Sequence, residues 1–257
     1  CTRRVPQAPF PRRLGQARSR AMTDTPRPIV RLTPKAQDRA IRHGFPWIYA
    51  DELVLDRRTR ALAPGTLAQL QDTARQPLGL VTLNPGSKIA ARILDRDPEA
   101  RIDTDWIAAR IARALALRAR LYPAPFYRLV HAEADGLPGL VIDRFGDAAA
   151  LQPNAAWTEA HLDPIVDALQ QVTGIRTVVR NASGRARALE GLDEGVEVIR
   201  GRLDGPVEVA MNGATYLADL TGGQKTGLYY DQRDNHAFAA RLAPGGRVLD
   251  VFSHVGG

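Results

Sequence analysis

Three stretches of this sequence combine glycine, charged and aromatic residues in patterns that could bind a nucleotide-like ligand. The last, RVLDVFSHVGG at 247–257, predicts an apolar strand that carries an acid, Asp250, and leads into a glycine-rich turn. Glycine lets the backbone approach a ligand closely, and the acid can bind a hydroxyl or cationic group. A structural turn explains the pattern equally well, and neither a dinucleotide-binding fingerprint nor a phosphate-binding loop accompanies it.

The second stretch, QKTGLYYDQRDN at 224–235, places two aromatic residues among charged ones. Tyr229 and Tyr230 lie close in sequence to Lys225 and Arg233. Aromatic rings can stack on an adenine or another base, and arginine can form two parallel hydrogen bonds with a carboxylate or phosphate. The charged start of a helix would have the same composition, so both interpretations stay open.

The third stretch, HAEADGLPGLVIDRFGD at 131–147, contains four residues that favour tight turns. Gly136, Pro138, Gly139 and Gly146 divide it into short strands. Because such turns are common between paired strands, this stretch favours a structural role over a catalytic one.

The elements around these stretches indicate a multidomain α+β protein. Residues 28–94 alternate apolar and polar positions in short runs, which predicts a small β barrel with one short helix. Residues 103–122 predict a helix whose arginines either contact phosphates or line its solvated face. Strands and a further helix follow to about residue 205, then a hairpin that turns at Asn212-Gly213, a helix from Asp231 and an apolar strand at 247–252.

The net charge of +7 is largely a property of the first 21 residues, which contain six arginines and no acid. From Met22 onward, 29 basic residues face 28 acidic ones, so any RNA contact must use a local basic patch. Met22 can be the true start of the protein, and a basic RNA-binding arm is the alternative. A secretory signal is disfavoured because the segment has no apolar core.

Metal binding and membrane insertion find no support in the sequence. The single cysteine is Cys1, and the five histidines are scattered, so we expect no disulfide within the chain and no metal site. No apolar run approaches the ~20 residues that a membrane-spanning helix needs. We expect a cytoplasmic protein.

Taken in order, EADGLPGLVIDRFGD, QKTGLYYDQRDN and RVLDVFSHVGG resemble the class I S-adenosylmethionine-dependent methyltransferases of large-subunit ribosomal RNA that carry an N-terminal PUA domain. RLTPKAQDRAIRHGFPWIYADELV resembles the PUA opening of that family, and the resemblance runs from about residue 29 to residue 257. After the basic leader, which takes up residues 1–27 and lies outside the resemblance, it implies a PUA-like RNA-binding barrel at 28–95 and a central α+β domain at 96–205. A β-hairpin linker at 206–230 and the first strand of a Rossmann-like donor-binding domain at 231–257 would complete the chain.

The resemblance also implies the residues that contact the methyl donor and the RNA. The donor-binding residues would be Gln224, Lys225, Thr226, Gly227, Tyr229, Asp231, Gln232, Arg233, Asp250, Phe252, Ser253, Gly256 and Gly257. The RNA-binding residues would be Lys35, Arg39, Arg42, His43 and Trp47. His254 and Val255 stand where the family often has Tyr and Thr, which departs from the family pattern at this loop.

Characterised members of that family make 5-methylcytosine in ribosomal RNA, often as homodimers. Such enzymes use a cysteine thiolate to attack C6, so that C5 can take the methyl group. The resemblance puts this nucleophile beyond residue 257, so no catalytic residue is assigned, and we expect the 257-residue chain to bind the donor poorly and not to methylate RNA alone. A non-catalytic RNA-binding protein built on the barrel, or a different nucleotide-dependent enzyme, are the alternatives.

Overall fold

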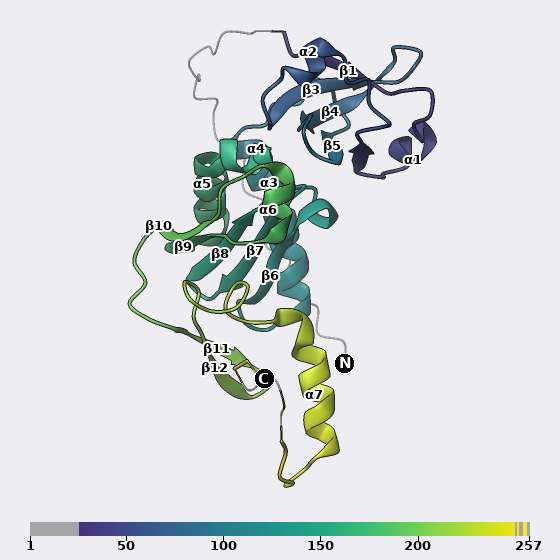
Figure 1. Cartoon of the computed structure of the whole chain (residues 1–257). Coiled ribbons are helices and arrows are strands. Elements are labelled where there is room, and N and C mark those ends of the chain that lie inside the picture. The colour runs from purple at the N-terminus through teal and green to yellow at the C-terminus, as the bar shows by residue number, and fades with distance from the viewer. Residues whose placement is uncertain (1–25, 250, 252–253, 256–257) are drawn as a thin grey trace, which may run out of the picture.

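The computed structural model describes residues 26–249, 251, 254 and 255 (Figure 1). Its first part is a five-stranded sheet in the order β1-β3-β4-β5-β2, in which only the β1–β3 pair is parallel. A bridge between Leu32 and Leu53 links the segments that follow the two edge strands. The strands are β1 (Ile29–Arg31), β2 (Trp47–Tyr49), β3 (Thr66–Gln71), β4 (Pro77–Leu83) and β5 (Ile89–Asp95), with short helices α1 (Asp38–Arg42) and α2 (Arg57–Arg60).

Apolar side chains on the inner face of this sheet form its core. Ile48, Ala68, Leu70 and Val81 are completely buried there. In β3 the buried positions Ala68 and Leu70 are two residues apart, as expected for a strand with one face inward. Strand β2 has only three residues, because the chain enters a turn after Tyr49.

The second part is a five-stranded sheet in the order β10-β9-β8-β7-β6. Neighbouring strands are antiparallel except β8 and β9, which are parallel. A parallel pair needs a crossover connection, which α4 and α5 supply here. The elements are α3 (Thr104–Leu121), β6 (Phe126–His131), η1 (Ala132–Asp135), β7 (Leu140–Phe145), β8 (Ala148–Pro153), α4 (Ala156–Ala160), α5 (Leu162–Thr173), β9 (Thr177–Ala182), α6 (Arg185–Glu190) and β10 (Gly195–Arg200).

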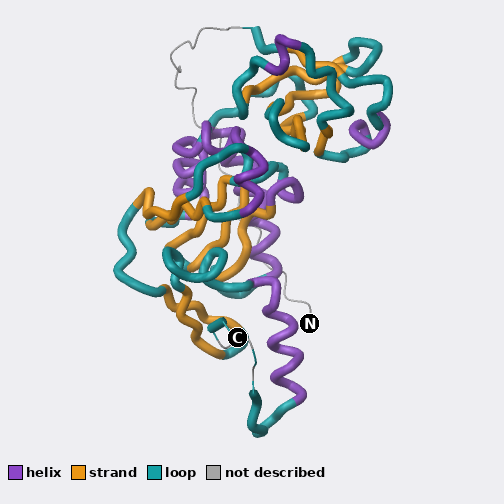
Figure 2. Tube along the Cα trace, in the orientation of Figure 1, coloured by secondary structure: helices purple, strands orange, loops and turns teal. Residues whose placement is uncertain are grey.

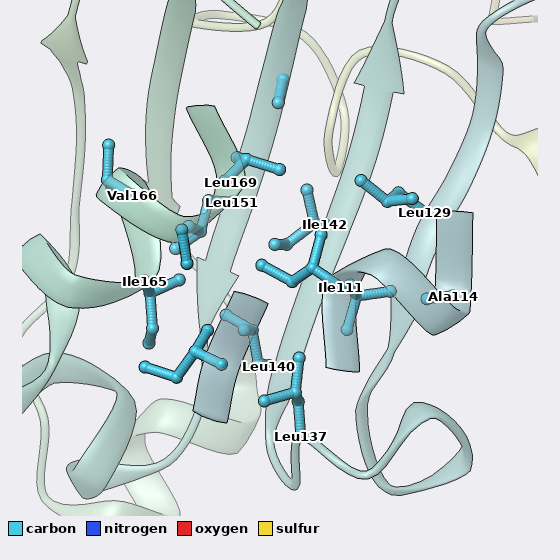
Figure 3. Close-up of a cluster of buried hydrophobic side chains, with 14 of the residues drawn as sticks. Ile111, Ala114, Leu129, Leu137, Leu140, Ile142, Leu151, Ile165, Val166 and Leu169 are labelled. Carbon is cyan, nitrogen blue, oxygen red and sulfur yellow. The ribbon is translucent and has the colours of Figure 1, made fainter. Parts of the chain in front are cut away.

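This central sheet packs against different partners on its two faces. Helices α3 and α5 cover one face, where Ile111, Ile142, Leu151 and Leu169 are completely buried (Figure 3). Successive residues of a strand point to opposite faces, so the strand residues next to Ile142 and Leu151 point to the second face of the sheet. That second face packs against a hairpin, β11 (Val207–Met211) and β12 (Ala214–Ala218), and against the loop that follows it.

The hairpin turns at Asn212-Gly213, as the sequence predicts, and both residues have positive φ. After the loop come η2 (Tyr230–Gln232) and α7 (Arg233–Leu242). The hairpin and α7 lie at the opposite end of the described molecule from the first sheet (Figure 2).

The predicted strand at 247–252 is wrong for the part of it that the structure describes. Residues 247–249 belong to no strand, and Val248 and Leu249 are 75% and 85% exposed. A strand exists only through hydrogen bonds to a neighbour, and these residues pair with no other described segment. Asp250 and Phe252 lie outside the described residues.

A polar network joins the two parts through Glu190, the last residue of α6. Its carboxylate accepts hydrogen bonds from Asn84 Nδ2 at 2.9 Å and Ser87 Oγ at 3.2 Å, and it pairs with Arg92 at 2.9 Å. Trp47 Nε1 donates across the same junction to Glu133 at 2.8 Å. Side chains of the first part thus hold carboxylates of the second part at this junction.

Of the helices described, none combines the length and apolar character required to cross a membrane.

Candidate functional site

The loop at 219–229 is built around one residue, Asp219. Its Oδ1 accepts hydrogen bonds from the backbone N–H groups of Thr221 and Gly222, at 3.0 and 2.9 Å, and from the Thr221 hydroxyl at 3.0 Å. Its backbone carbonyl accepts from Gly223 N at 3.1 Å. These bonds, that of Gly222 first, lower the pKa of the Asp219 carboxyl, so it is a carboxylate at neutral pH.

Two glycines allow this loop to close on itself. A Cβ at Gly223 would lie 2.3 Å from the carbonyl oxygen of Asp219, and one at Gly227 would lie 2.8 Å from the same atom. Gly227 also has φ of +104°, which other residues rarely adopt. The loop therefore wraps a carbonyl oxygen, unlike a phosphate-binding loop, whose N–H groups surround an anion.

Thr226 fastens the loop to the centre of the sheet. Its hydroxyl donates to Asp143 Oδ2 at 2.7 Å, and both residues are completely buried. Arg128, which pairs directly with Asp143 across β6 and β7, donates to both oxygens of the same carboxylate at 2.9 and 3.0 Å. That pairing raises the pKa of Arg128, so the buried carboxylate always has a cationic partner.

Further hydrogen bonds hold the loop on both sides of Thr226. Asn181 Nδ2, on β9, donates to the backbone carbonyl of Lys225, whose φ is +51°. The Tyr230 hydroxyl donates to the carbonyl of Arg144 at 2.7 Å. Burial, reinforced by the charge of Asp143, raises the pKa of Tyr230, so this phenol stays protonated and a donor.

Arg233 is fixed at the end of this segment. Its guanidinium donates to the carbonyl of Phe126 and lies over the ring of Tyr122, 4.5 Å from the ring centre. It also lies 5.7 Å from the centre of the Tyr230 ring. Arg233 thus joins the start of α7 to the edge of the central sheet.

The outer side of the loop exposes polar groups around Tyr229. Its hydroxyl donates to Gln224 Oε1 at 3.0 Å, and the Lys225 ammonium lies 4.3 Å from its ring centre. The ring of His254 meets Tyr229 edge-on, with 5.7 Å between centroids. Val255 packs against the apolar cluster beneath the loop. The stretches at 224–235 and 247–257 therefore meet at Tyr229.

The structure divides the predicted donor-binding residues into two groups. Thr226 and Gly227 are buried and Arg233 is committed to the sheet, whereas Gln224, Lys225 and Asp231 are exposed and Tyr229 and Gln232 half-buried. The other predicted residues of this set lie outside the described residues: Asp250, Phe252, Ser253, Gly256 and Gly257.

The predicted RNA-binding residues lie on or beside α1 and β2. Lys35, Arg39 and His43 are exposed. Arg42 pairs with Asp72 and lies 3.7 Å from Asp38. Trp47 is half-buried at the junction of the two parts, where its indole N–H binds Glu133.

Sequence reasoning missed three residues that hold the loop: Asp143, Arg128 and Asn181. Asp143 lies in the stretch at 131–147, which the sequence assigns to structural turns. A signal was present, since Asp143 is a charged residue within the apolar run of a predicted strand, and such a charge needs a partner. Within the part of the chain that the structure describes, no three His, Cys, Asp or Glu side chains are grouped as metal ligands would be.

Comparison with known proteins agrees with this architecture. Residues 30–96 match the family described as PUA-like domain. The chain is 33% identical, over 86% of its length, to the ribosomal RNA large subunit methyltransferase I of Alteromonas mediterranea, and covers 56% of that protein. It is 34% identical, over 91% of its length, to the ribosomal RNA large subunit methyltransferase of Deinococcus radiodurans, and covers 59% of it. The chain thus spans somewhat more than half the length of these curated relatives.

Two solved structures share the fold. A Streptococcus mutans protein assigned as a SAM-dependent methyltransferase superposes with a TM-score of 0.68 at 17% identity, over 82% of this chain and 53% of the other. A second structure, assigned as a methyltransferase and solved in complex with SAH, gives 0.66 at 17% identity, over 82% and 52%.

Fold and sequence together define the class: a PUA-like domain joined to an α+β domain like that of structures assigned as SAM-dependent methyltransferases. More particularly, the chain is similar over most of its length to proteins named ribosomal RNA large subunit methyltransferases.

Proposed function

We propose that this protein is an S-adenosylmethionine-dependent methyltransferase that acts on large-subunit ribosomal RNA. The contact between Tyr229 and His254 carries the proposal, because it joins the two stretches whose residues resemble donor-binding motifs. The names of the relatives support the RNA substrate, and the structure in complex with SAH supports the donor. Because the similarity extends far beyond the PUA-like domain, a purely RNA-binding protein is the less favoured alternative.

The exposed side of the loop fits such a donor. The half-buried ring of Tyr229 offers a flat face for adenine, and the Gln224 amide and Asp231 carboxylate can bind hydroxyl and ammonium groups. When bound, the donor supplies a methyl group on a positively charged sulfur. We propose that Gln224, Lys225, Tyr229, Asp231 and Gln232 contact it directly, while Thr226, Gly227 and Arg233 hold the loop that presents them.

The finer points of the proposal rest on the family resemblance. They are C5 of cytosine as the methylated atom and a homodimer as the assembly. The cytoplasm as the site of action follows from a ribosomal RNA substrate. The only cysteine of the chain is Cys1, which lies outside the described residues, and no residue is assigned as the nucleophile.

Donor binding can be tested by nuclear magnetic resonance on the 257-residue chain. Millimolar S-adenosylmethionine and SAH should shift the backbone resonances of 224–232, whereas ATP at the same concentration should not. Replacement of Tyr229 by Ala should abolish these shifts, because the adenine loses its flat partner. Equal shifts with ATP, or an unmoved loop at millimolar donor, would contradict the proposed site.

A further inference from the structure

Asn181 is a buried side chain of β9 that reaches the loop at 219–229 from the central sheet. It is 3% exposed, and its Nδ2 donates a hydrogen bond to the backbone carbonyl of Lys225. Its Oδ1 accepts a hydrogen bond from the hydroxyl of Ser183 at 2.6 Å. Both ends of this amide are therefore bonded within the protein, so Asn181 holds the loop in one defined way.

Ser183 favours the orientation in which Asn181 holds the loop. A carbonyl oxygen can only accept a hydrogen bond, so Lys225 is held only while Asn181 turns its NH2 group toward it. If the amide turned over, its oxygen would face the oxygen of the Lys225 carbonyl. The Ser183 hydroxyl donates to Oδ1 and thereby stabilises the orientation that avoids this repulsion.

Lys225 adopts a backbone conformation that residues with a side chain rarely take. Its φ is +51°, in the left-handed region, where the Cβ of an L-residue lies too close to the following carbonyl oxygen. The bond from Asn181 fixes the carbonyl of this residue and so opposes its return to an ordinary conformation. The carbonyl of Lys225 therefore points to β9, while its ammonium lies 4.3 Å from the centre of the Tyr229 ring.

We propose that Asn181 and Ser183 are positioning residues for the methyl donor, which act through Lys225 and touch no donor atom themselves. By holding Lys225 in the left-handed conformation, they keep its ammonium against the ring of Tyr229. A cation and a ring that are already in place lose little conformational freedom when a ligand binds them. The inference rests on the proposed donor site and adds to it two residues that lie outside the stretch at 224–235.

The first test needs no donor. Protons that lie over an aromatic ring resonate upfield, so the side-chain Hε signals of Lys225 report its contact with Tyr229. In the 257-residue chain, we expect Asn181→Ala to return these signals toward their ordinary position, and Asn181→Asp to do the same because a carboxylate cannot donate. Asn154→Ala is the control, since Asn154 Oδ1 has no hydrogen-bond partner among the described residues, and it should leave the signals in place.

The second test measures the affinity for SAH by nuclear magnetic resonance titration of residues 224–232. We expect Asn181→Ala to weaken binding about tenfold, the factor that corresponds to one hydrogen bond of ordinary strength. Ser183→Ala should weaken it less, because Ser183 is exposed and water can donate in its place. Ser183→Thr, which keeps the hydroxyl, should restore the affinity. Unchanged amide resonances of β6, β7 and β8 show that each variant is folded.

Lys225→Gly separates positioning from general support of the loop. Glycine adopts the left-handed conformation without strain and carries no ammonium, so Asn181 has nothing left to position. We expect Asn181→Ala to weaken SAH binding when Lys225 is present and to have little effect in the Lys225→Gly background.

An equal loss in both backgrounds, or Lys225 signals that stay upfield in Asn181→Ala, would overturn the positioning role and leave the donor site standing. A wild-type loop that is unmoved at millimolar SAH would overturn the proposed donor site, whereas the Lys225 signals report on Asn181 independently of any donor.

Discussion

A single hydroxyl group connects the candidate donor loop to the centre of the molecule. Thr226 and Asp143 are separated by 83 positions in the sequence, yet both are completely buried and hydrogen-bonded to each other. Asp143 also binds Arg128, which lies in the central sheet and does not belong to the loop. The loop therefore depends on this carboxylate more than the carboxylate depends on the loop.

Replacement of Thr226 by Val tests this connection. Val has nearly the same shape but cannot donate, so we expect the free energy of unfolding to fall by about 2 kcal/mol, the usual size of a hydrogen bond to a charged group. Donor-induced shifts of 224–232 should weaken as well. Urea denaturation measures the first effect.

Thr226→Ser is the matched control, because it keeps the hydroxyl and loses only a methyl group. Its expected cost is about 1 kcal/mol. If the Ser variant proves less stable than the Val variant, packing of the methyl group holds the loop, and the hydrogen bond does not.

The sequence identified only one of the two residues in this contact as part of the site. The resemblance singled out Thr226 as a donor-binding residue, whereas Asp143 was interpreted as part of a structural stretch. The pairing depends on how the hairpin places the loop over the sheet, and nothing local to either residue records that placement.

At the scale of elements, periodicity predicted the long elements and missed two of the short helices. The eighteen-residue α3 and the hairpin at Asn212-Gly213 agree with their patterns. Helices α2 and α6 have four and six residues, too few for an apolar stripe to repeat, and were not predicted. The apolar run at 247–252 was predicted as a strand, yet its residues 247–249 belong to no strand. An apolar pattern shows that a segment could be a strand, but not that a neighbouring strand is there to pair with it.

Two of the four arginines of α3 follow neither alternative that the sequence left open for them. Arg110 binds Asp95 at 2.7 Å and lies 3.3 Å from the centre of the Trp106 ring. Arg118 forms two hydrogen bonds with Asp135, at 2.6 and 2.7 Å. Both arginines are engaged within the protein, where they tie α3 to neighbouring elements.

Asp95 at the end of β5 should make stability depend on pH. Burial alone would raise the pKa of Asp95, but hydrogen bonds from Asp97 N, Trp106 Nε1 and Arg110 outweigh it and lower the pKa below 3.8. The stabilisation is thus present above pH 3.8 and lost as pH falls through the lowered pKa. Asp95→Asn should lower the free energy of unfolding by about 1 kcal/mol at pH 7, and less at pH 3.

Urea denaturation at the two pH values measures the difference, with Asp51→Asn as the control. Asp51 is exposed, and its carboxylate accepts no hydrogen bond from a residue within the described ranges. A deficit in Asp95→Asn that is the same at pH 3 and pH 7 would show that the carboxylate charge does not contribute.

At the scale of the whole molecule, Glu190 links the PUA-like domain to the central one. The residue is 5% exposed and receives Asn84, Ser87 and Arg92 from the first domain. Replacement by Gln keeps the shape but removes the charge that Arg92 needs. We expect a loss of about 2 kcal/mol in stability, together with faster hydrogen exchange at 84–92.

Hydrogen exchange by mass spectrometry, with Glu194→Gln as the control, measures this coupling. Glu194 is exposed a few residues further along the chain, and its replacement should leave exchange unchanged. Slow exchange at 84–92 in both variants would mean that apolar packing alone fixes the two domains.

Motif order predicted a PUA-like domain followed by an α+β part, but not the junction between them. Asn84, Ser87 and Glu190 carry no pattern that distinguishes them from ordinary surface residues. They are buried because two separately folded surfaces meet there, which is a property of the assembled molecule.

The parallel pairing of β8 with β9 also governs how the chain reaches its native state. The hairpins β3–β4, β6–β7, β7–β8 and β11–β12 each close over a short connection. In contrast, β9 pairs with β8 across the connection that contains α4 and α5. Loops of this length close late, because their entropy must be lost before any contact compensates for it. The β9 strand carries Asn181, so this anchor of the candidate loop depends on a pairing that is slower to form than the hairpins.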